Sequence, residues 1–175
     1  RTIPGITIIS PADSFETIKA LESAIKSKNS SYIRLTGSSN NPIVYKEDYN
    51  FEIGKSVKLK EGKDVTIFCA GAMVYNSLQA TEKLRENGIS CSVINMHTIK
   101  PIDKNAINDA CRNSKLLVSV EEHNVIGGLG SSISEHLVTV KNSPNLLIIG
   151  INDTYSKGGS YNFLKEKHGL SPGKI

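Results

Sequence analysis

The chain has 175 residues, a net charge of +4, 38% hydrophobic residues and 22% charged residues. This length is enough for a domain with its own hydrophobic core, without support from disulfides or metal ions. The composition excludes disordered and fibrous classes of protein, and no apolar run approaches the roughly 20 residues needed to cross a bilayer.

The first 36 residues predict a strand, a helix and a second strand. Ile6–Ile9 is a short apolar run, and residues 10–28 begin with Ser10 as a cap, Pro11 at the first helical position and Asp13 near the positive end of the helix dipole. Apolar residues then recur at near-helical spacing and predict an amphipathic helix. They are Phe15, Ile18, Leu21 and Ile25.

The run SYIRLTG (31–37) is typical of a strand, and Arg34 lies in its middle among residues expected to be largely buried. A guanidinium is always charged and needs an anionic partner in such a place. The residues themselves leave two alternatives open, a structural ion pair with a carboxylate or a binding contact to a phosphate.

Residues 37–62 are polar and rich in turns, and they predict a linker with one or two short strands between two separately packed pieces. The densest basic stretch of the chain lies here, with Lys55, Lys58, Lys60 and Lys63. A surface for nucleic acid would place stacking aromatic residues among such lysines. This stretch has none, so we expect a solvated hairpin or linker and no nucleic-acid partner.

Residues 63–175 alternate between apolar runs and helical patterns. The predicted strands are 65–71, 89–96, 115–122 and 146–151. The predicted helices are 73–87, which ends at Gly88, then 103–112, a helix near 131–140, and a short helix within 159–169. This alternation predicts a three-layer α/β/α domain with a mostly parallel sheet.

A glycine cluster, Gly127, Gly128 and Gly130, follows the third of these strands. It matches neither the dinucleotide fingerprint G-x-G-x-x-G nor a P-loop, and dinucleotide folds carry their fingerprint after the first strand. Glycines allow a positive φ and a close approach of helix to sheet, so we interpret the turn as structural. An anion bound at the N-terminus of the helix is the alternative.

Glu121, Glu122 and His123 lie at the carboxyl end of that strand, where parallel sheets usually contact ligands. Because no nucleophile or metal-ligand spacing accompanies them, we assign no catalytic or metal-binding residue here and expect a role in an interface or in bracing a loop. The other histidines, at 97, 136 and 168, are isolated in the sequence.

The three cysteines, Cys69, Cys91 and Cys111, form no C-x-x-C pair, so neither a zinc site nor a redox dithiol is indicated. Cys69 and Cys91 lie inside apolar runs and are predicted to be buried, reduced thiols. We therefore expect a reducing, cytoplasmic environment.

Several segments, in this order, resemble the transketolase family. RTIPGITIISPAD and YIRLTG resemble the end of its pyrimidine-binding domain, and EGKDVTIFCAG, INMHTIKPID and VEEHNVIGGLGSSISEHL resemble its C-terminal domain. The resemblance covers nearly the whole chain. It implies a partial α/β unit at 1–36, a linker at 37–62 and a transketolase C-terminal-type domain at 63–175.

The resemblance also implies a function. The chain is expected to be a C-terminal fragment or subunit of a thiamine-diphosphate-dependent transketolase, which moves two-carbon units between sugar phosphates in the pentose phosphate pathway. The groups that hold and activate thiamine diphosphate and Mg²⁺ are expected upstream of Arg1 or on another subunit, so this chain alone should bind no cofactor and be inactive. The implied partners are the remaining transketolase domains or an N-terminal subunit, further copies of the chain in a homo-oligomer, and a sugar phosphate.

Arg34 is similar to the family's substrate-phosphate arginine, and the resemblance makes it a substrate-binding residue. A second candidate is a part of 1-deoxy-D-xylulose-5-phosphate synthase, which shares the same two domains. The segment NMHTIKPID and His123 look closer to the smaller C-terminal subunits of transketolase. A third interpretation is a non-catalytic interaction module that has kept the fold.

Overall fold

The computed structural model describes residues 1–37 and 41–175, and in these residues it contains two β-sheets. The larger sheet has five strands in the order β3-β5-β4-β7-β8. Its strands are β3 (Val57–Lys60), β4 (Val65–Cys69), β5 (Cys91–Asn95), β7 (Leu116–Asn124) and β8 (Asn145–Ile151). β4, β5, β7 and β8 run parallel, and β3 pairs with β5 in the antiparallel direction.

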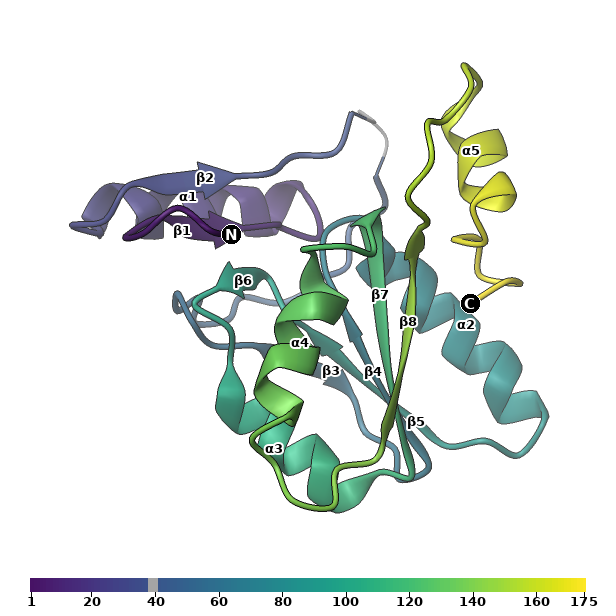
Figure 1. Cartoon of the computed structure of the whole chain (residues 1–175). Coiled ribbons are helices and arrows are strands. Elements are labelled where there is room, and N and C mark those ends of the chain that lie inside the picture. Colours follow the sequence, from purple (N-terminus) through teal and green to yellow (C-terminus); the bar gives the residue numbers. More distant parts are fainter. Residues whose placement is uncertain (38–40) are drawn as a thin grey trace.

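Helices cover both faces of this sheet (Figure 1). α2 (Met73–Glu86) lies on one face, and α3 (Lys104–Asn113) and α4 (Leu129–Leu137) lie on the other. Because successive side chains of a strand point to opposite faces, β4 contributes Ile67 to the core beneath α2 and Phe68 to the core beneath α3 and α4. The predicted three-layer, mostly parallel domain is confirmed. A short helix, α5 (Tyr161–Lys167), follows β8.

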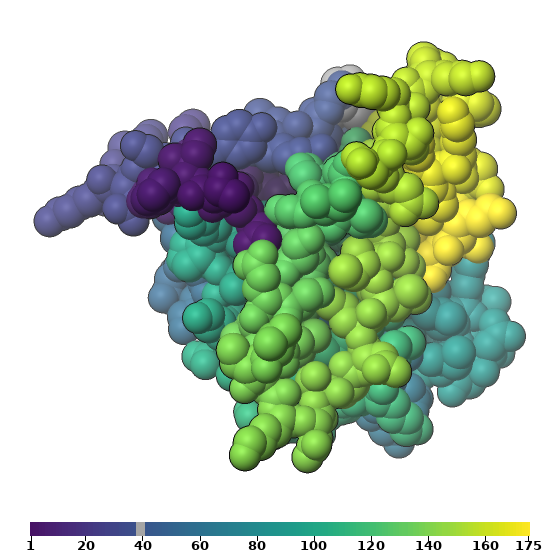
Figure 2. Space-filling view, viewed as in Figure 1, coloured from purple at the N-terminus to yellow at the C-terminus, as the bar shows by residue number. Residues whose placement is uncertain are grey.

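The smaller sheet lies across the carboxyl end of the larger one (Figures 1 and 2). It consists of β1 (Thr7–Ile9) between β2 (Ser31–Ile33) and β6 (Thr98–Lys100), with α1 (Ser14–Lys26) connecting β1 to β2. The predicted strand, helix and strand of residues 1–36 are therefore confirmed. The sequence did not predict β6, which pairs antiparallel with β1 and joins the two parts of the chain.

α1 begins later than predicted. Its cap is Asp13, whose carboxylate accepts a hydrogen bond from the N–H of Glu16 at 2.8 Å. Ser10 instead connects the two parts of the chain. Its N–H donates to the carbonyl of His97 at 2.8 Å, and its carbonyl accepts from the N–H of Gly71 at 3.1 Å.

Most of the apolar stripe of α1 points away from the protein, and only Phe15 at its start packs against the core beneath α2. Ile18, Leu21 and Ile25 are 60%, 52% and 75% exposed, whereas Glu16 and Ala20 on the side that faces the protein are fully buried. The periodicity predicted the helix correctly. It could not show which side of the helix finds a partner within this chain.

A buried carboxylate holds α1 against the larger sheet. Glu16 accepts hydrogen bonds from the side-chain amide of Asn95 on β5 at 2.9 and 3.0 Å and from the hydroxyl of Tyr45 at 3.0 Å. The hydroxyl of Tyr49 and the N–H of Ala12 also donate to it. Burial raises the pKa of Glu16, and these hydrogen bonds partly oppose the rise. We refer to these five residues as the Glu16 network.

The stretch interpreted as a linker contains β3, which supplies an edge strand to the larger sheet. Two of its lysines form surface ion pairs, Lys58 with Glu61 and Lys60 with Glu82. Such exposed pairs contribute little to stability. Residues 38–40 of this stretch lie outside the described residues, and the division at 36 and 62 stays a prediction.

Cys69 and Cys91 are buried free thiols, as predicted, and Cys111 is half-buried. Burial raises the pKa of Cys69 to about 12, so this thiol packs as a small apolar group. No helix among residues 1–37 and 41–175 is long and apolar enough to cross a membrane.

Candidate functional site

A cavity of about 200 Å³ lies where the smaller sheet meets the larger one. The first part of the chain and β6 supply Arg1, Ile8, Ser10, Tyr32, Arg34 and Ile99, and the larger domain supplies Ala70, Glu121, Glu122, His123, Gly127, Gly128 and Leu129. The predicted site residue Arg34 and the polar residues 121–123 therefore line one cavity.

The topology of the sheet explains this position. β4 and β7 are parallel neighbours, and the chain leaves β4 into α2 on one face and β7 into α4 on the other. A crevice forms at the carboxyl ends of two strands whose connections diverge in this way, and open α/β sheets bind their ligands there. The cavity thus occupies the ordinary ligand position of this type of sheet.

The glycine turn at the start of α4 holds a carboxylate of the protein itself. Glu121 is 4% exposed and accepts hydrogen bonds from the N–H groups of Leu129 at 2.7 Å and Gly130 at 2.8 Å. Burial raises the pKa of Glu121, and these two bonds oppose the rise. Because the anion position of the helix is already filled, the geometry favours the structural interpretation of the turn over a phosphate cradle.

Gly128 leaves the space that this carboxylate occupies. A Cβ atom at position 128 would lie 1.9 Å from Oε2 of Glu121, with no room for both. We expect Gly128→Ala to lower the free energy of unfolding by about 1–3 kcal/mol, as overpacking of a buried site usually does. Urea denaturation measures this change.

The matched control is Gly158→Ala, because a Cβ atom there meets nothing within 4 Å. This substitution should change stability by less than about 1 kcal/mol. If both variants unfolded at the same urea concentration, the contact between Gly128 and Glu121 would be unimportant.

Arg34 follows β2 directly instead of lying in the middle of a strand, so the mid-strand prediction was wrong. Three residues are enough for β2 because it pairs only with the equally short β1. Arg34 is half-buried, and its Nη2 donates to the backbone carbonyl of Glu122 at 2.7 Å. Among the described residues, no carboxylate oxygen lies within 4.0 Å of it. Within residues 1–37 and 41–175 the guanidinium therefore has no internal ion pair, and donors remain there for a ligand.

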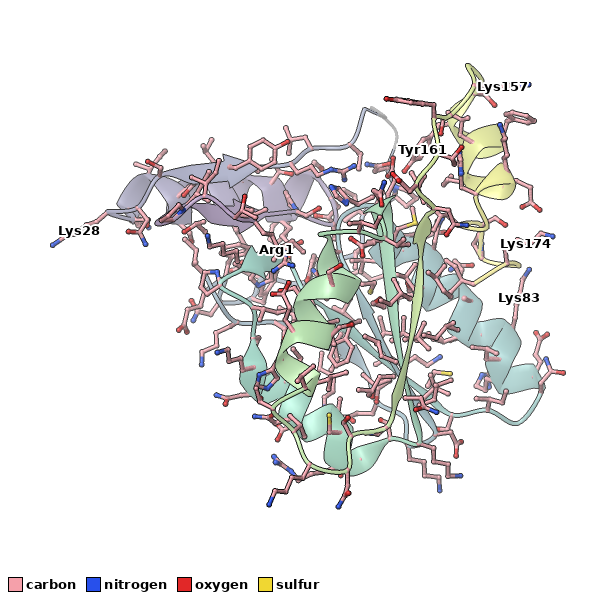
Figure 3. The ribbon with its side chains drawn as sticks, viewed as in Figure 1. Arg1, Lys28, Lys83, Lys157, Tyr161 and Lys174 are labelled. Atoms are coloured by element: carbon pink, nitrogen blue, oxygen red, sulfur yellow. The ribbon has the colours of Figure 1, made fainter. Side chains whose placement is uncertain are left out.

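The other charged groups around the cavity have partners. Arg1 pairs with Glu135 at 2.6 Å, and its Nε donates to the carbonyl of Gly127 at 2.9 Å. Glu122 accepts a hydrogen bond from the hydroxyl of Tyr161 at 2.7 Å. Arg1 lies between β1 and the top of α4, and Tyr161 lies at the start of α5 (Figure 3). The sequence did not connect either residue with the site, because Arg1 and Tyr161 lie far along the chain from residues 121–123 or in a different predicted element.

The remaining histidines lie away from the cavity lining. His97 stacks on Phe51 at 4.1 Å between ring centroids, and burial lowers its pKa to about 4. His136 bonds to Asn108 at 2.9 Å, and His168 bonds to Ser156 at 2.6 Å. These contacts are structural.

The described residues do not fit a magnesium-bound diphosphate by themselves. Among them, no group of three or more His, Cys, Asp and Glu side chains could hold a metal ion. The N–H groups of Leu129 and Gly130 at the start of α4, which could otherwise donate to a phosphate, donate to Glu121.

Comparison with known proteins gives one consistent family. The model of the transketolase C-terminal domain matches residues 54–175. The chain is 37% identical to the putative transketolase C-terminal section of Methanocaldococcus jannaschii, over 97% of this chain and 53% of that protein. It is 38% identical to a 6-deoxy-6-sulfo-D-fructose transketolase subunit of Clostridium sp. strain MSTE9, over 100% of this chain and 54% of that protein.

Among solved structures, a split-gene transketolase described as an inactive beta4 tetramer superposes with a TM-score of 0.92 and 36% identity. The match covers 99% of this chain and 56% of that one. The 1-deoxy-D-xylulose-5-phosphate synthase of Methylacidiphilum infernorum is 34% identical, over 98% of this chain and 27% of that enzyme. The chain spans about half the length of the first of these relatives.

Proposed function

This chain belongs to the transketolase family, and we propose that it is the C-terminal part of a thiamine-diphosphate-dependent transketolase that transfers glycolaldehyde units between sugar phosphates. The superposition on a split-gene transketolase, with a TM-score of 0.92 at 36% identity, is the observation that carries this proposal. The pentose phosphate pathway and the cytoplasm are part of the same proposal. Three free cysteines agree with a reducing compartment.

The second candidate is the corresponding part of a 1-deoxy-D-xylulose-5-phosphate synthase, which the 34% identity to the M. infernorum enzyme supports. The relatives with the higher identities, 37% and 38%, are named as transketolase sections or subunits of about twice this length. These relatives favour the transketolase.

We propose that a companion domain or subunit supplies the cofactor site with thiamine diphosphate and Mg²⁺. The donor set described above does not fit that group, and the relatives contain about twice as much chain. The exposed stripe of Ile18, Leu21 and Ile25 on α1 supports a packing partner, because apolar side chains grouped on one face usually mark an interface.

In this assembly Arg34 is proposed to hold the phosphate of the sugar substrate. Its guanidinium lines the cavity at the carboxyl end of the sheet and has no carboxylate partner among the described residues. Binding energy from a remote phosphate helps to position the reacting carbonyl. Thiamine supplies the carbanion chemistry when it is bound, and the residues of this chain orient the substrate.

Reconstitution tests the proposal. The chain mixed with its companion polypeptide, thiamine diphosphate and Mg²⁺ is expected to transfer two-carbon units from a ketose phosphate to an aldose phosphate. Each polypeptide alone serves as the control and should be inactive. Formation of 1-deoxy-D-xylulose 5-phosphate by the mixture would favour the second candidate, and a mixture inactive in both assays would support the non-catalytic module.

A further inference from the structure

β8 forms one edge of the larger sheet. In the view of Figure 1 this edge lies nearest the reader, and in Figure 2 the yellow-green residues of β8 are open to the surface beside α4. The strand has the sequence NLLIIGI, with no charged residue and no proline. An edge of this kind presents unpaired backbone groups to any other strand of suitable shape.

The backbone groups of β8 alternate between β7 and the open edge. The carbonyl of Ile151 accepts a hydrogen bond from the N–H of Val125 at 2.9 Å, so Ile151 is oriented toward β7. With the period of two in a strand, Leu147 and Ile149 share this orientation. The N–H and C=O groups of the residues between them, Leu146, Ile148 and Gly150, then point outward.

The opposite edge of the sheet is protected. β3 carries Lys58 and Lys60, and its pairing with β5 shifts register between these two residues. Charged side chains and bulges are the common means by which proteins prevent one sheet edge from pairing with another. β8 has no such charge.

We propose that β8 pairs with β8 of a second copy of this chain, antiparallel about a two-fold axis at Ile148, so that two larger sheets become one continuous sheet. In this register Ile148 lies opposite Ile148 of the second copy, and Leu146 lies opposite Gly150. Every outward N–H and C=O then meets a partner.

Side-chain packing supports the same register. Leu147 is 50% exposed, and Ile149 packs in the core beneath α2, on the same face of the sheet. Directly opposite residues of an antiparallel pair share a face, so Leu147 would cover Ile149 of the second copy.

A second copy fits this edge better than an unrelated strand, because an uncharged strand meets no like charge when it pairs with itself. Self-association also occurs in this family, since the 36% identical split-gene protein is described as a beta4 tetramer.

Sedimentation equilibrium of the chain, alone and with its companion, tests this interface. The wild type is expected to dimerise at micromolar concentration, and Leu147→Glu should weaken the dimer at least about tenfold by placing two buried charges near the axis. Lys58→Glu, a charge change at the opposite edge, is the matched control and should leave the dimer intact. Circular dichroism verifies that both variants fold.

Hydrogen exchange gives a second measurement that needs no substitution. The N–H of Ile148 should become more protected as the protein concentration rises. A wild type that stays monomeric overturns the proposal, as does a dimer that resists Leu147→Glu but is lost with Ile25→Glu on α1. Because these readouts follow assembly of the chain and not activity, they are independent of the transketolase assay.

Discussion

Replacing Arg34 by alanine in the reconstituted enzyme is expected to raise the KM for phosphorylated sugars by about 10- to 100-fold. The loss corresponds to the roughly 1.5–3 kcal/mol that a hydrogen bond to a charged group contributes. The KM for unphosphorylated substrates should change by less than about threefold, because they have no group for the guanidinium to bind. Steady-state kinetics with matched pairs of sugars measure both values.

Arg112→Ala is the control for loss of a positive charge. Arg112 is exposed on α3 and pairs only with Asp109 among the described residues, far from the cavity lining. Arg34→Lys adds a test of geometry, because lysine keeps the charge but loses the planar pair of donors. If Arg34→Ala raised the KM for both kinds of sugar equally, the guanidinium would be positioning the site and not binding phosphate.

Local sequence patterns were sufficient to predict the helices and the long strands. β4, β5, β7 and β8 are apolar runs bounded by turn residues, and such runs are typical of strands covered on both faces. β6 was missed because three residues carry too little pattern, and its pairing with β1 joins segments about 90 residues apart. Short strands of this kind are stabilised by their tertiary neighbours and not by their own sequence.

The candidate site could be predicted only in part. The location of the site at the carboxyl end of β7 could be predicted, because Glu121, Glu122 and His123 come directly after an apolar run. The contact between Arg34 and the carbonyl of Glu122 joins residues 88 positions apart. The sequence favoured a structural turn and left a bound anion at the start of α4 as the alternative, and the structure places the carboxylate of Glu121 there. Spacing alone cannot identify a carboxylate that folds back onto its own turn.

Glu16 was not predicted to be important, because a glutamate near the start of an amphipathic helix is usually solvated. The structure buries it completely among hydrogen-bond donors from three separate segments. Tyr45, Tyr49 and Asn95 lie far from it in the sequence. The signal that could have found the network is the pair of tyrosines in an otherwise polar stretch, since buried tyrosines need partners for their hydroxyl groups.

Glu16→Ala is expected to lower the free energy of unfolding by about 3 kcal/mol, because it leaves a small cavity and several buried donors without an acceptor. For a chain of this size the melting temperature should fall by roughly 6–12 °C. Glu16→Gln keeps the volume and one acceptor oxygen, so its effect should be less than half as large. Glu22→Ala is the control, because Glu22 is an exposed residue of the same helix.

The pH dependence of the unfolding free energy distinguishes the effect of the Glu16 charge from the effect of its side-chain volume. Burial raises the pKa of Glu16 in the folded state above the ordinary carboxyl value of 4.5, so the folded state holds this proton more tightly than the unfolded chain. The contribution of this proton to the free energy of unfolding is fully present below that ordinary value and is lost as the pH rises through the raised pKa.

Glu16→Gln has no proton to lose. The unfolding free energy of the wild type minus that of Glu16→Gln should therefore decrease as the pH rises above that ordinary value. A constant difference would mean that the donors around Glu16 stabilise its charge fully, and that the network holds α1 equally well in either protonation state.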